Sequence, residues 1–260
     1  MKTQRNLITA LVLLLWITPS VLNAQITGKE VIEKVYNREE GKDRKGNLTM
    51  TLVNSRGDQR VRELRQFYKD YGETEKKIMF FLSPADVRNT SFMNWSYNDP
   101  SRDDDQWIYL PALRRVKRIS SDSKDDYFMG SDFTYDDLGE RHPDEDHHKL
   151  RRTETIKGEK CYVVESKSKD SDYMYSKTIT WVIKDKWIGL KKKFYDEDGN
   201  FLKELHVKEY KKLDGIWIIL NSVMKNVQKN HKTLMEYDNV ELNTGIRDAY
   251  FTERMMSRGL

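Results

Sequence analysis

The stretch that decides the fold is residues 48–71, which reads LTMTLV-NSRGD-QRVRELRQFYKDY. Leu48, Met50 and Leu52 alternate with threonines, and this period of two is typical of a strand with one buried face. The segment NSRGD at 54–58 combines residues that favour turns, and the alternation resumes after it. The stretch therefore predicts a β-hairpin.

The same period continues through most of the chain. Further alternating runs cover residues 75–82, 90–97, 106–119, 150–156, 160–168, 177–183, 189–195, 201–213, 216–225 and 232–242. Glycine-containing turns at 157–159, 196–200 and 213–215 separate several of them, which predicts an antiparallel meander. Several runs have about ten residues, against about five or six in an average strand, and long strands favour a strongly curved sheet.

The composition agrees with elements that bury one face. The chain is 37% hydrophobic and 34% charged, which disfavours a parallel sheet buried on both faces and excludes a polytopic membrane protein. An opening helix is expected after Thr27, because Glu30 completes a capping box and apolar residues then recur at helical spacing until Gly41. Shorter helical segments are expected at 83–87, 133–138 and 247–256. The predicted fold class is mainly β with a few helices, built on a single curved antiparallel sheet.

The first 24 residues have the pattern of a secretory signal peptide. Lys2 and Arg5 precede an apolar run at 7–17, and the segment ends in the small residue Ala24. We expect cleavage there and one mature domain at 25–260, with 140–149 as a loop inside it; an uncleaved anchor is the alternative. Gln25 stands where a lipidated cysteine would be needed, so no stable membrane anchor is expected. Removing Lys2 and Arg5 lowers the formal net charge from +4 to +2, too weak for nucleic-acid binding.

Aromatic and methionine side chains on the strands are candidates for an apolar ligand surface. The candidates are Phe80, Phe92, Trp95, Trp107, Tyr109, Trp181 and Met235. Ordinary core packing is the alternative for each of them. At 79–81 and 92–95, large apolar residues occupy successive positions and so point to both faces of the strand. This indicates either a sheet that is covered on both faces or an inner face that its own residues only partly fill.

Two further segments are candidates for ligand contacts. Residues 128–138 combine Met129 and Phe133 with a Gly-Ser pair and three aspartates, a composition suited to closing over an apolar cavity with the charged side in water. A passive plug is the alternative reading. Arg115 and Arg118 lie in a basic strand that could face an anionic head group or an acidic partner; a solvated face is the alternative.

Catalysis is not supported by any motif. His142, His147 and His148 stand among acidic residues, but their spacing matches no ordered zinc site, and a solvated acidic loop is the simpler reading. An exported hydrolase with a metal in this loop is the weakest alternative. Cys161 lies in an apolar alternation and is expected to be a buried thiol. We expect no enzyme activity and no cofactor.

Three motifs resemble those of the LolA-like outer-membrane lipoprotein-sorting proteins: FLSPADV at 81–87, WIYLPALRRV with KRI at 107–119, and FMGSDF through DDL at 128–138. The resemblance implies an exported bacterial protein of the periplasm, with an incomplete β-barrel and helices across its mouth. It also implies a carrier of lipid or lipoprotein acyl chains. Members nearer to this chain resemble companions of RND-type inner-membrane exporters, so a non-catalytic accessory subunit of such an exporter is the alternative function.

Overall fold

The structure is a computed structural model that describes residues 25–260; the expected signal peptide at 1–24 lies outside these residues. Its centre is one sheet of 13 strands, all paired in antiparallel fashion. The strands are β1 Asp43–Val53, β2 Gln59–Asp70, β3 Thr74–Ser83, β4 Ser91–Tyr97, β5 Asp105–Leu110, β6 Arg115–Arg118, β7 Asp146–Ile156, β8 Glu159–Ser168, β9 Lys177–Ile183, β10 Gly189–Tyr195, β11 Phe201–Leu213, β12 Ile216–Asn226 and β13 His231–Leu242. The predicted hairpin and meander are confirmed.

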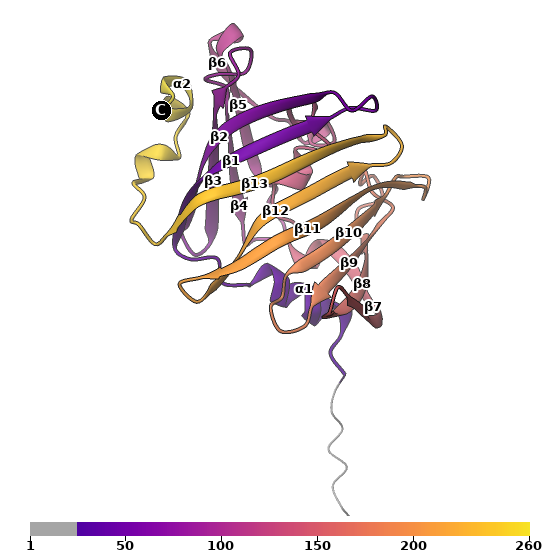
Figure 1. Ribbon diagram of the computed structural model, residues 1–260. Coiled ribbons are helices and arrows are strands. Elements are labelled where there is room, and N and C mark those ends of the chain that lie inside the picture. Colours follow the sequence, from indigo (N-terminus) through magenta and orange to yellow (C-terminus); the bar gives the residue numbers. More distant parts are fainter. Residues whose placement is uncertain (1–24) are drawn as a thin grey trace, which may run out of the picture.

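The strand order shows where the barrel is open. β1 lies in the middle of the sheet between β2 and the last strand, β13, so the two edges are β6 and β7. These edge strands are consecutive along the chain, and residues 119–145 connect them. The sheet curves strongly, and this connection lies inside the curve (Figure 1). The predicted incomplete barrel is confirmed.

Helix α1, Gly28–Tyr36, covers one end of the concave face. The predicted capping box is present, since Glu30 N donates to Thr27 Oγ1 and Thr27 N donates to the Glu30 carboxylate. The helix ends at Tyr36, before the expected Gly41, and the C-cap residue Asn37 leaves the helical conformation with ψ of 18° while its side chain donates to Glu33 O. Its apolar stripe packs against strands β7–β9 through Val31, Val164 and Val182. No helix among the described residues is long and apolar enough to cross a bilayer.

Three sequence predictions need correction. The segment at 83–87, which was expected to be helical, is the end of β3 followed by turns. The run at 106–119 is two strands, because Pro111 begins a short 3-10 helix, η1 Pro111–Leu113, and Arg114 then adopts a left-handed φ of 49°. The loop expected at 140–149 already contains the start of β7 at Asp146. The connection at 119–145 holds four more 3-10 helices, η2 Ser121–Ser123, η3 Phe128–Gly130, η4 Asp136–Leu138 and η5 Pro143–Glu145.

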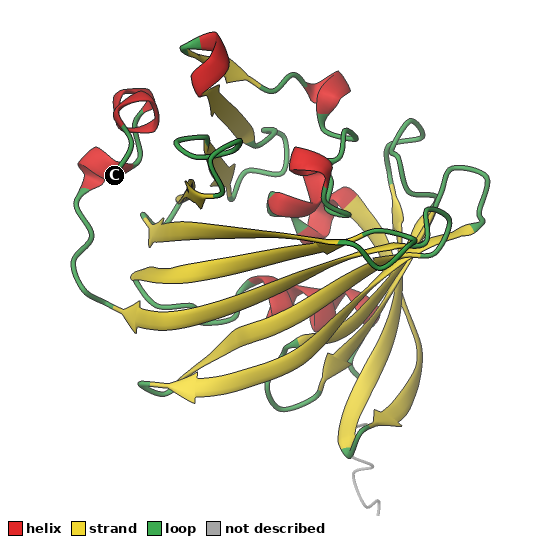
Figure 2. Ribbon diagram, turned by 45° about the horizontal axis from the view of Figure 1, so that its top comes forward, coloured by secondary structure: helices red, strands yellow, loops and turns green. Residues whose placement is uncertain are grey.

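The C-terminal tail covers the outside of the sheet. It contains η6 Asp248–Tyr250 and α2 Glu253–Arg258, which lie outside the curve, opposite the helical turns of the connection (Figure 2). Phe251 and Met256 are buried against Phe80 and Met93 of the outer face. The sheet is therefore covered on both faces, which accounts for the large apolar residues at both parities of β3 and β4.

Candidate ligand-binding site

An apolar cluster lines the concave face and is the first candidate for a ligand surface. We call it the inner cluster. Its buried strand residues include Leu48, Met50, Leu52, Leu64, Met79, Phe81, Phe92, Met224 and Met235. Three of the predicted ligand residues, Phe92, Phe133 and Met235, meet here, and Met129 packs against them. The structure thus brings four of the predicted residues together on one side of the sheet.

The connection at 119–145, which we call the covering segment, fills the space above the inner cluster. Phe128 is fully buried, with its ring centre 5.1 Å from that of Phe92 and 5.9 Å from that of Phe81. The Tyr135 ring lies 5.7 Å from Phe128 and 5.8 Å from Phe92. The inner cluster is therefore in contact with aromatic side chains of the chain itself.

A buried ion pair fastens the covering segment to the sheet. Lys203 of β11 is fully buried, pairs with the Asp137 carboxylate and donates to Asp132 O at 3.1 Å. The Tyr175 hydroxyl also donates to Asp137, at 3.1 Å, and burial together with this carboxylate raises the Tyr175 pKa well above its ordinary value. A buried ion pair of this kind is costly to break on one side only, since the remaining charge loses its partner.

Further polar contacts fasten the same segment. The Asp132 carboxylate lies 2.7 Å from both Thr233 Oγ1 and His231 Nδ1 of β13, and Arg62 Nη1 donates to Met129 O at 2.6 Å. The expectation that Asp132 and Asp137 face water is wrong, because Asp132 is 1% exposed and the Asp137 side chain 4%. Their partners on the sheet draw both carboxylates inward.

The other part of the concave face is polar. Glu40 pairs with Arg38 and with Arg44, the latter at 3.0 Å, while Lys77 Nζ lies 3.6 Å from Glu140. Burial and the nearby carboxylates of Glu140 and Glu40 raise the pKa of Glu75 to about 7. This part of the face suits charged or strongly polar groups.

A cavity of about 210 Å³ opens beside these charges. The pairing of β12 with β13 stops at Asn221 and Glu236, although both strands continue. Arg44, Gln66 and Tyr237 line the cavity, together with apolar residues of the separating strands. The open space along this side is therefore bordered by both polar and apolar groups.

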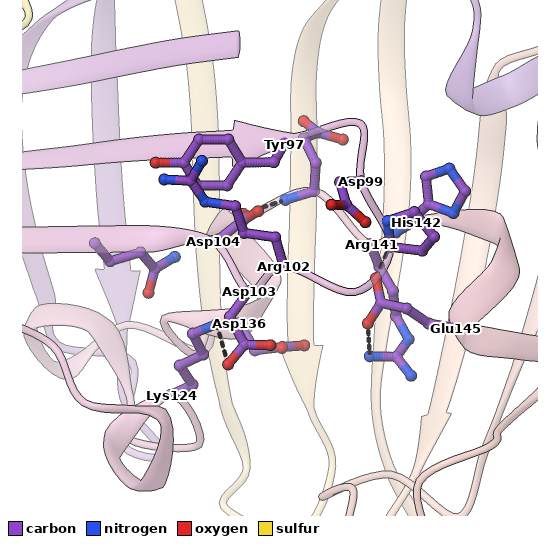
Figure 3. Close-up of a pocket in the computed structure, with 14 residues that line it drawn as sticks. Tyr97, Asp99, Arg102, Asp103, Asp104, Lys124, Asp136, Arg141, His142 and Glu145 are labelled. Atoms are coloured by element: carbon purple, nitrogen blue, oxygen red, sulfur yellow. Dashed lines mark hydrogen bonds and ion pairs between the residues drawn. The ribbon is translucent and has the colours of Figure 1, made fainter. Parts of the chain in front are cut away.

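At the rim, a small cavity of about 50 Å³ lies between the β4–β5 turn and the covering segment (Figure 3). Its charged groups mostly pair with one another: Arg141 Nη1 lies 2.9 Å from Glu145, and Lys124 Nζ lies 3.7 Å from Asp103. Glu140 N donates to the Asp104 carboxylate at 3.0 Å. This arrangement fastens the rim and leaves room only for a few water molecules.

Two of the three histidines, His142 and His148, have structural contacts, and the cysteine is buried. The His148 ring nitrogens lie 2.7 Å from Ser166 Oγ and 2.8 Å from Pro143 O, and burial lowers the pKa of His148. His142 Nδ1 accepts from Asp144 N and caps η5. Within residues 25–260, no three His, Cys, Asp or Glu side chains are grouped to hold a metal. Burial raises the pKa of the Cys161 thiol to about 11, which keeps it protonated.

The remaining predicted ligand residues lie elsewhere. Phe80, Trp95, Trp107 and Tyr109 belong to an outer cluster under the C-terminal tail. They point away from Phe92 and Met79 because successive side chains of a strand face opposite sides. A ligand contact at these four positions stays a prediction, and it would require the tail to move.

Three predicted residues stand apart from both clusters. Trp181 packs with Cys161 and Val163 in a third cluster. Arg115 is exposed at the sheet edge, and Arg118 pairs with Asp105. Their role in ligand binding also stays a prediction.

Lys203 and Arg62 were not predicted from the sequence. Lys203 stands two positions from Leu205 in β11, and Arg62 two positions from Leu64 in β2, so both alternate in phase with residues of the inner cluster. A basic residue in phase with an apolar face is the signal that could have identified them.

An open antiparallel barrel with a covered apolar concave face is a fold of lipid- and lipoprotein-binding carriers. A family model described as an uncharacterized protein matches residues 73–258. The chain is 33% identical to an outer membrane lipoprotein-sorting protein domain from Vibrio parahaemolyticus, over 89% of this chain and 98% of that one, with a TM-score of 0.83. It is 29% identical to a DUF1329 family protein from Desulfovibrio piger, over 88% of this chain and 97% of that one, also with a TM-score of 0.83.

A LolA superfamily protein from Nitrosomonas europaea shares the fold, with a TM-score of 0.67 at 18% identity over 88% of this chain and 99% of that one. No curated protein matches the chain significantly. The chain belongs to the LolA-like family of outer membrane lipoprotein-sorting proteins.

Proposed function

We propose that residues 25–260 form a periplasmic carrier domain that binds acyl chains of lipids or lipoproteins at the inner cluster, after cleavage of a signal peptide at 1–24. The observation that carries the proposal is the covering segment: its aromatic side chains occupy an apolar face, yet polar contacts hold it in place. Such a cover can be exchanged for a ligand, because its polar groups regain water when it lifts.

The exchange is energetically plausible. An acyl chain contributes about 0.8 kcal/mol for each methylene group that it hides from water. A long chain can therefore offset the exposure of Phe128, Phe133 and Tyr135 together with the lost polar contacts. Phe92, Met129, Phe133 and Met235 are the proposed contacts of the bound chain.

Two methionines give a matched test. Met79 and Met93 are both buried on neighbouring strands, but Met79 belongs to the inner cluster and Met93 to the outer one. Met79→Ala and Met93→Ala should each lower the free energy of unfolding by about 2–5 kcal/mol. Titration of detergent-free protein with a fluorescent long-chain lipid should show a tighter Kd for Met79→Ala, since a ligand fills the new space, and an unchanged Kd for Met93→Ala.

The outcomes separate the site from general effects on stability. Equal changes in Kd for both variants would place binding away from the inner cluster. Saturable binding that neither variant alters would also place the binding site away from the inner cluster. No saturable binding by the wild type would end the carrier proposal.

A second candidate function is that of a non-catalytic accessory subunit of an RND-type envelope exporter. One observation favours it: the inner cluster is filled by Phe128 and Tyr135 of the chain itself. This candidate predicts no lipid in organic extracts of protein purified from its native envelope without detergent. It also predicts that the protein co-purifies with an inner-membrane transporter after cross-linking in cells.

A further inference from the structure

Exposed leucines gather at one end of the outer face. Within residues 25–260, the exposed large apolar side chains are Val61, Tyr71, Leu82, Leu113 and Leu260. Leu113 is 52% exposed in the turn between β5 and β6, and Leu82 is 40% exposed near the end of β3. Isolated exposed leucines are common on proteins, so their grouping is what needs an explanation.

The strand register places these leucines at the same end of the sheet. β3 ends where β4 begins at Ser91, and Ser91 pairs with Tyr109 near the end of β5. Leu110 then pairs with Arg115 at the start of β6. Helix α2 lies at this end as well (Figure 1). Ser91 Oγ, at the start of β4, donates to Met256 O of the helix at 3.1 Å.

This end is also basic. The exposed arginines are Arg88, Arg114, Arg115, Arg254 and Arg258, and none of them forms an ion pair with another described residue. The exposed acidic side chains among the same turns and helix are only Asp86 and Glu253. Exposed arginines without ion-pair partners beside exposed leucines match a surface that carries negative charge over an apolar layer.

We propose that this end of the protein, the basic tip formed by the 83–90 turn, the 110–115 turn and α2, docks on the surface of a membrane that contains anionic phospholipids. Leu113 and Leu82 enter the boundary between head groups and acyl chains, and the arginines bind lipid phosphates. The short helix η1 and the left-handed Arg114 hold Leu113 outward on a fixed turn. The docking does not depend on what the concave face binds.

Vesicle sedimentation tests the proposal directly. The mature protein should sediment with vesicles of phosphatidylcholine mixed with phosphatidylglycerol, and only weakly with pure phosphatidylcholine. Added salt should weaken the binding, because the arginines act through screened charges. The variant Arg114→Gln/Arg115→Gln should lower the partition coefficient about fivefold for each arginine, and Leu113→Ser about fivefold.

A control carries the same change of charge elsewhere. Lys211→Gln/Lys212→Gln removes two exposed cations from β11, far along the chain from the basic tip, and should change the partition coefficient much less. Unfolding midpoints in urea should be measured for every variant, to establish that each one is folded. The proposal is wrong if both vesicle types bind equally, if the tip variants behave like the control, or if the tip binds an acidic protein and no vesicle.

Discussion

Removing the charge of Lys203 should loosen the covering segment more than it unfolds the sheet. Lys203 is fully buried and Asp137 nearly so, so Lys203→Met leaves a carboxylate without its cation in a dry environment. Breaking a buried pair on one side costs about 3–5 kcal/mol, whereas an exposed pair contributes about 0–1 kcal/mol. Asp137 keeps hydrogen bonds from Thr134 N and Tyr175, which places the expected loss near 3 kcal/mol.

Methionine is the right replacement because the lysine stem packs among aromatic rings. The Lys203 ammonium lies 5.2 Å from the ring centre of Tyr175, 5.3 Å from Phe194 and 5.4 Å from Tyr127. Methionine has a similar length and packs well against aromatic rings. The substitution therefore removes the charge and leaves most of the packing.

The loss should appear locally. Strands β1 and β13 are joined by a ladder of backbone hydrogen bonds, whereas side chains hold the covering segment. Hydrogen exchange followed by mass spectrometry should show faster exchange within residues 119–145. A loss of about 3 kcal/mol corresponds to roughly a hundredfold change in the opening equilibrium. Peptides from β1 and β13 should keep most of their protection.

Two control variants test whether the Lys203–Asp137 ion pair fastens the covering segment. Lys191→Met breaks a more exposed pair with Glu204 on the same sheet and should leave the covering segment unchanged. Lys203→Met/Asp137→Asn removes both charges and should recover much of the lost protection, because the introduced amide oxygen still accepts hydrogen bonds. If Lys203→Met exchanges like the Lys191→Met variant, the ion pair does not fasten the segment.

Two further predictions concern stability. The pKa of Glu75 is about 7 in the folded protein, above its ordinary 4.5, so the folded state holds a proton that the unfolded state releases, and stability should fall as pH rises between these values. In urea unfolding at a series of pH values, Glu75→Gln should make the free energy of unfolding depend less on pH in this range. An unchanged pH dependence would show that other groups cause the fall. Asp43→Ala should lower the free energy of unfolding by about 2–4 kcal/mol, since the buried Asp43 accepts from the backbone of Thr244, Gly245 and Ile246. A loss below about 0.5 kcal/mol in a urea titration would contradict this role.

Most of the sheet could be predicted because its signals are local. Alternation and turn residues lie within a few positions of each other, and the runs expected at 177–183 and 189–195 coincide with β9 and β10. The division between β5 and β6 was missed although Pro111 marks it, because the alternation continues through the turn. The pairing of β1 with β13 joins distant parts of the chain and has no local signal.

The candidate site could be predicted only in part, because the covering segment and the C-terminal tail both pack on large apolar residues of the sheet. Met79 and Phe80 are adjacent and both apolar, yet one faces the covering segment and the other the tail. Asp132 looked like a solvated loop residue, because its partner His231 lies 99 residues further along the chain. Long-range partners of this kind decide which polar groups are buried.

The two covers differ in what their removal would expose. Lifting the tail exposes Phe251 and Met256, whose side chains gain nothing from water. Lifting the covering segment also exposes apolar rings, but it returns Asp132, Asp137 and Lys203 to water, which recovers part of the hydration lost on burial. Lifting the tail also frees polar groups, but those of its ion pair, Lys69 and Asp248, are already 24% and 72% exposed. Opening on the concave side therefore regains more hydration than opening on the convex side. This difference is the physical reason to expect ligands at the inner cluster rather than under the tail.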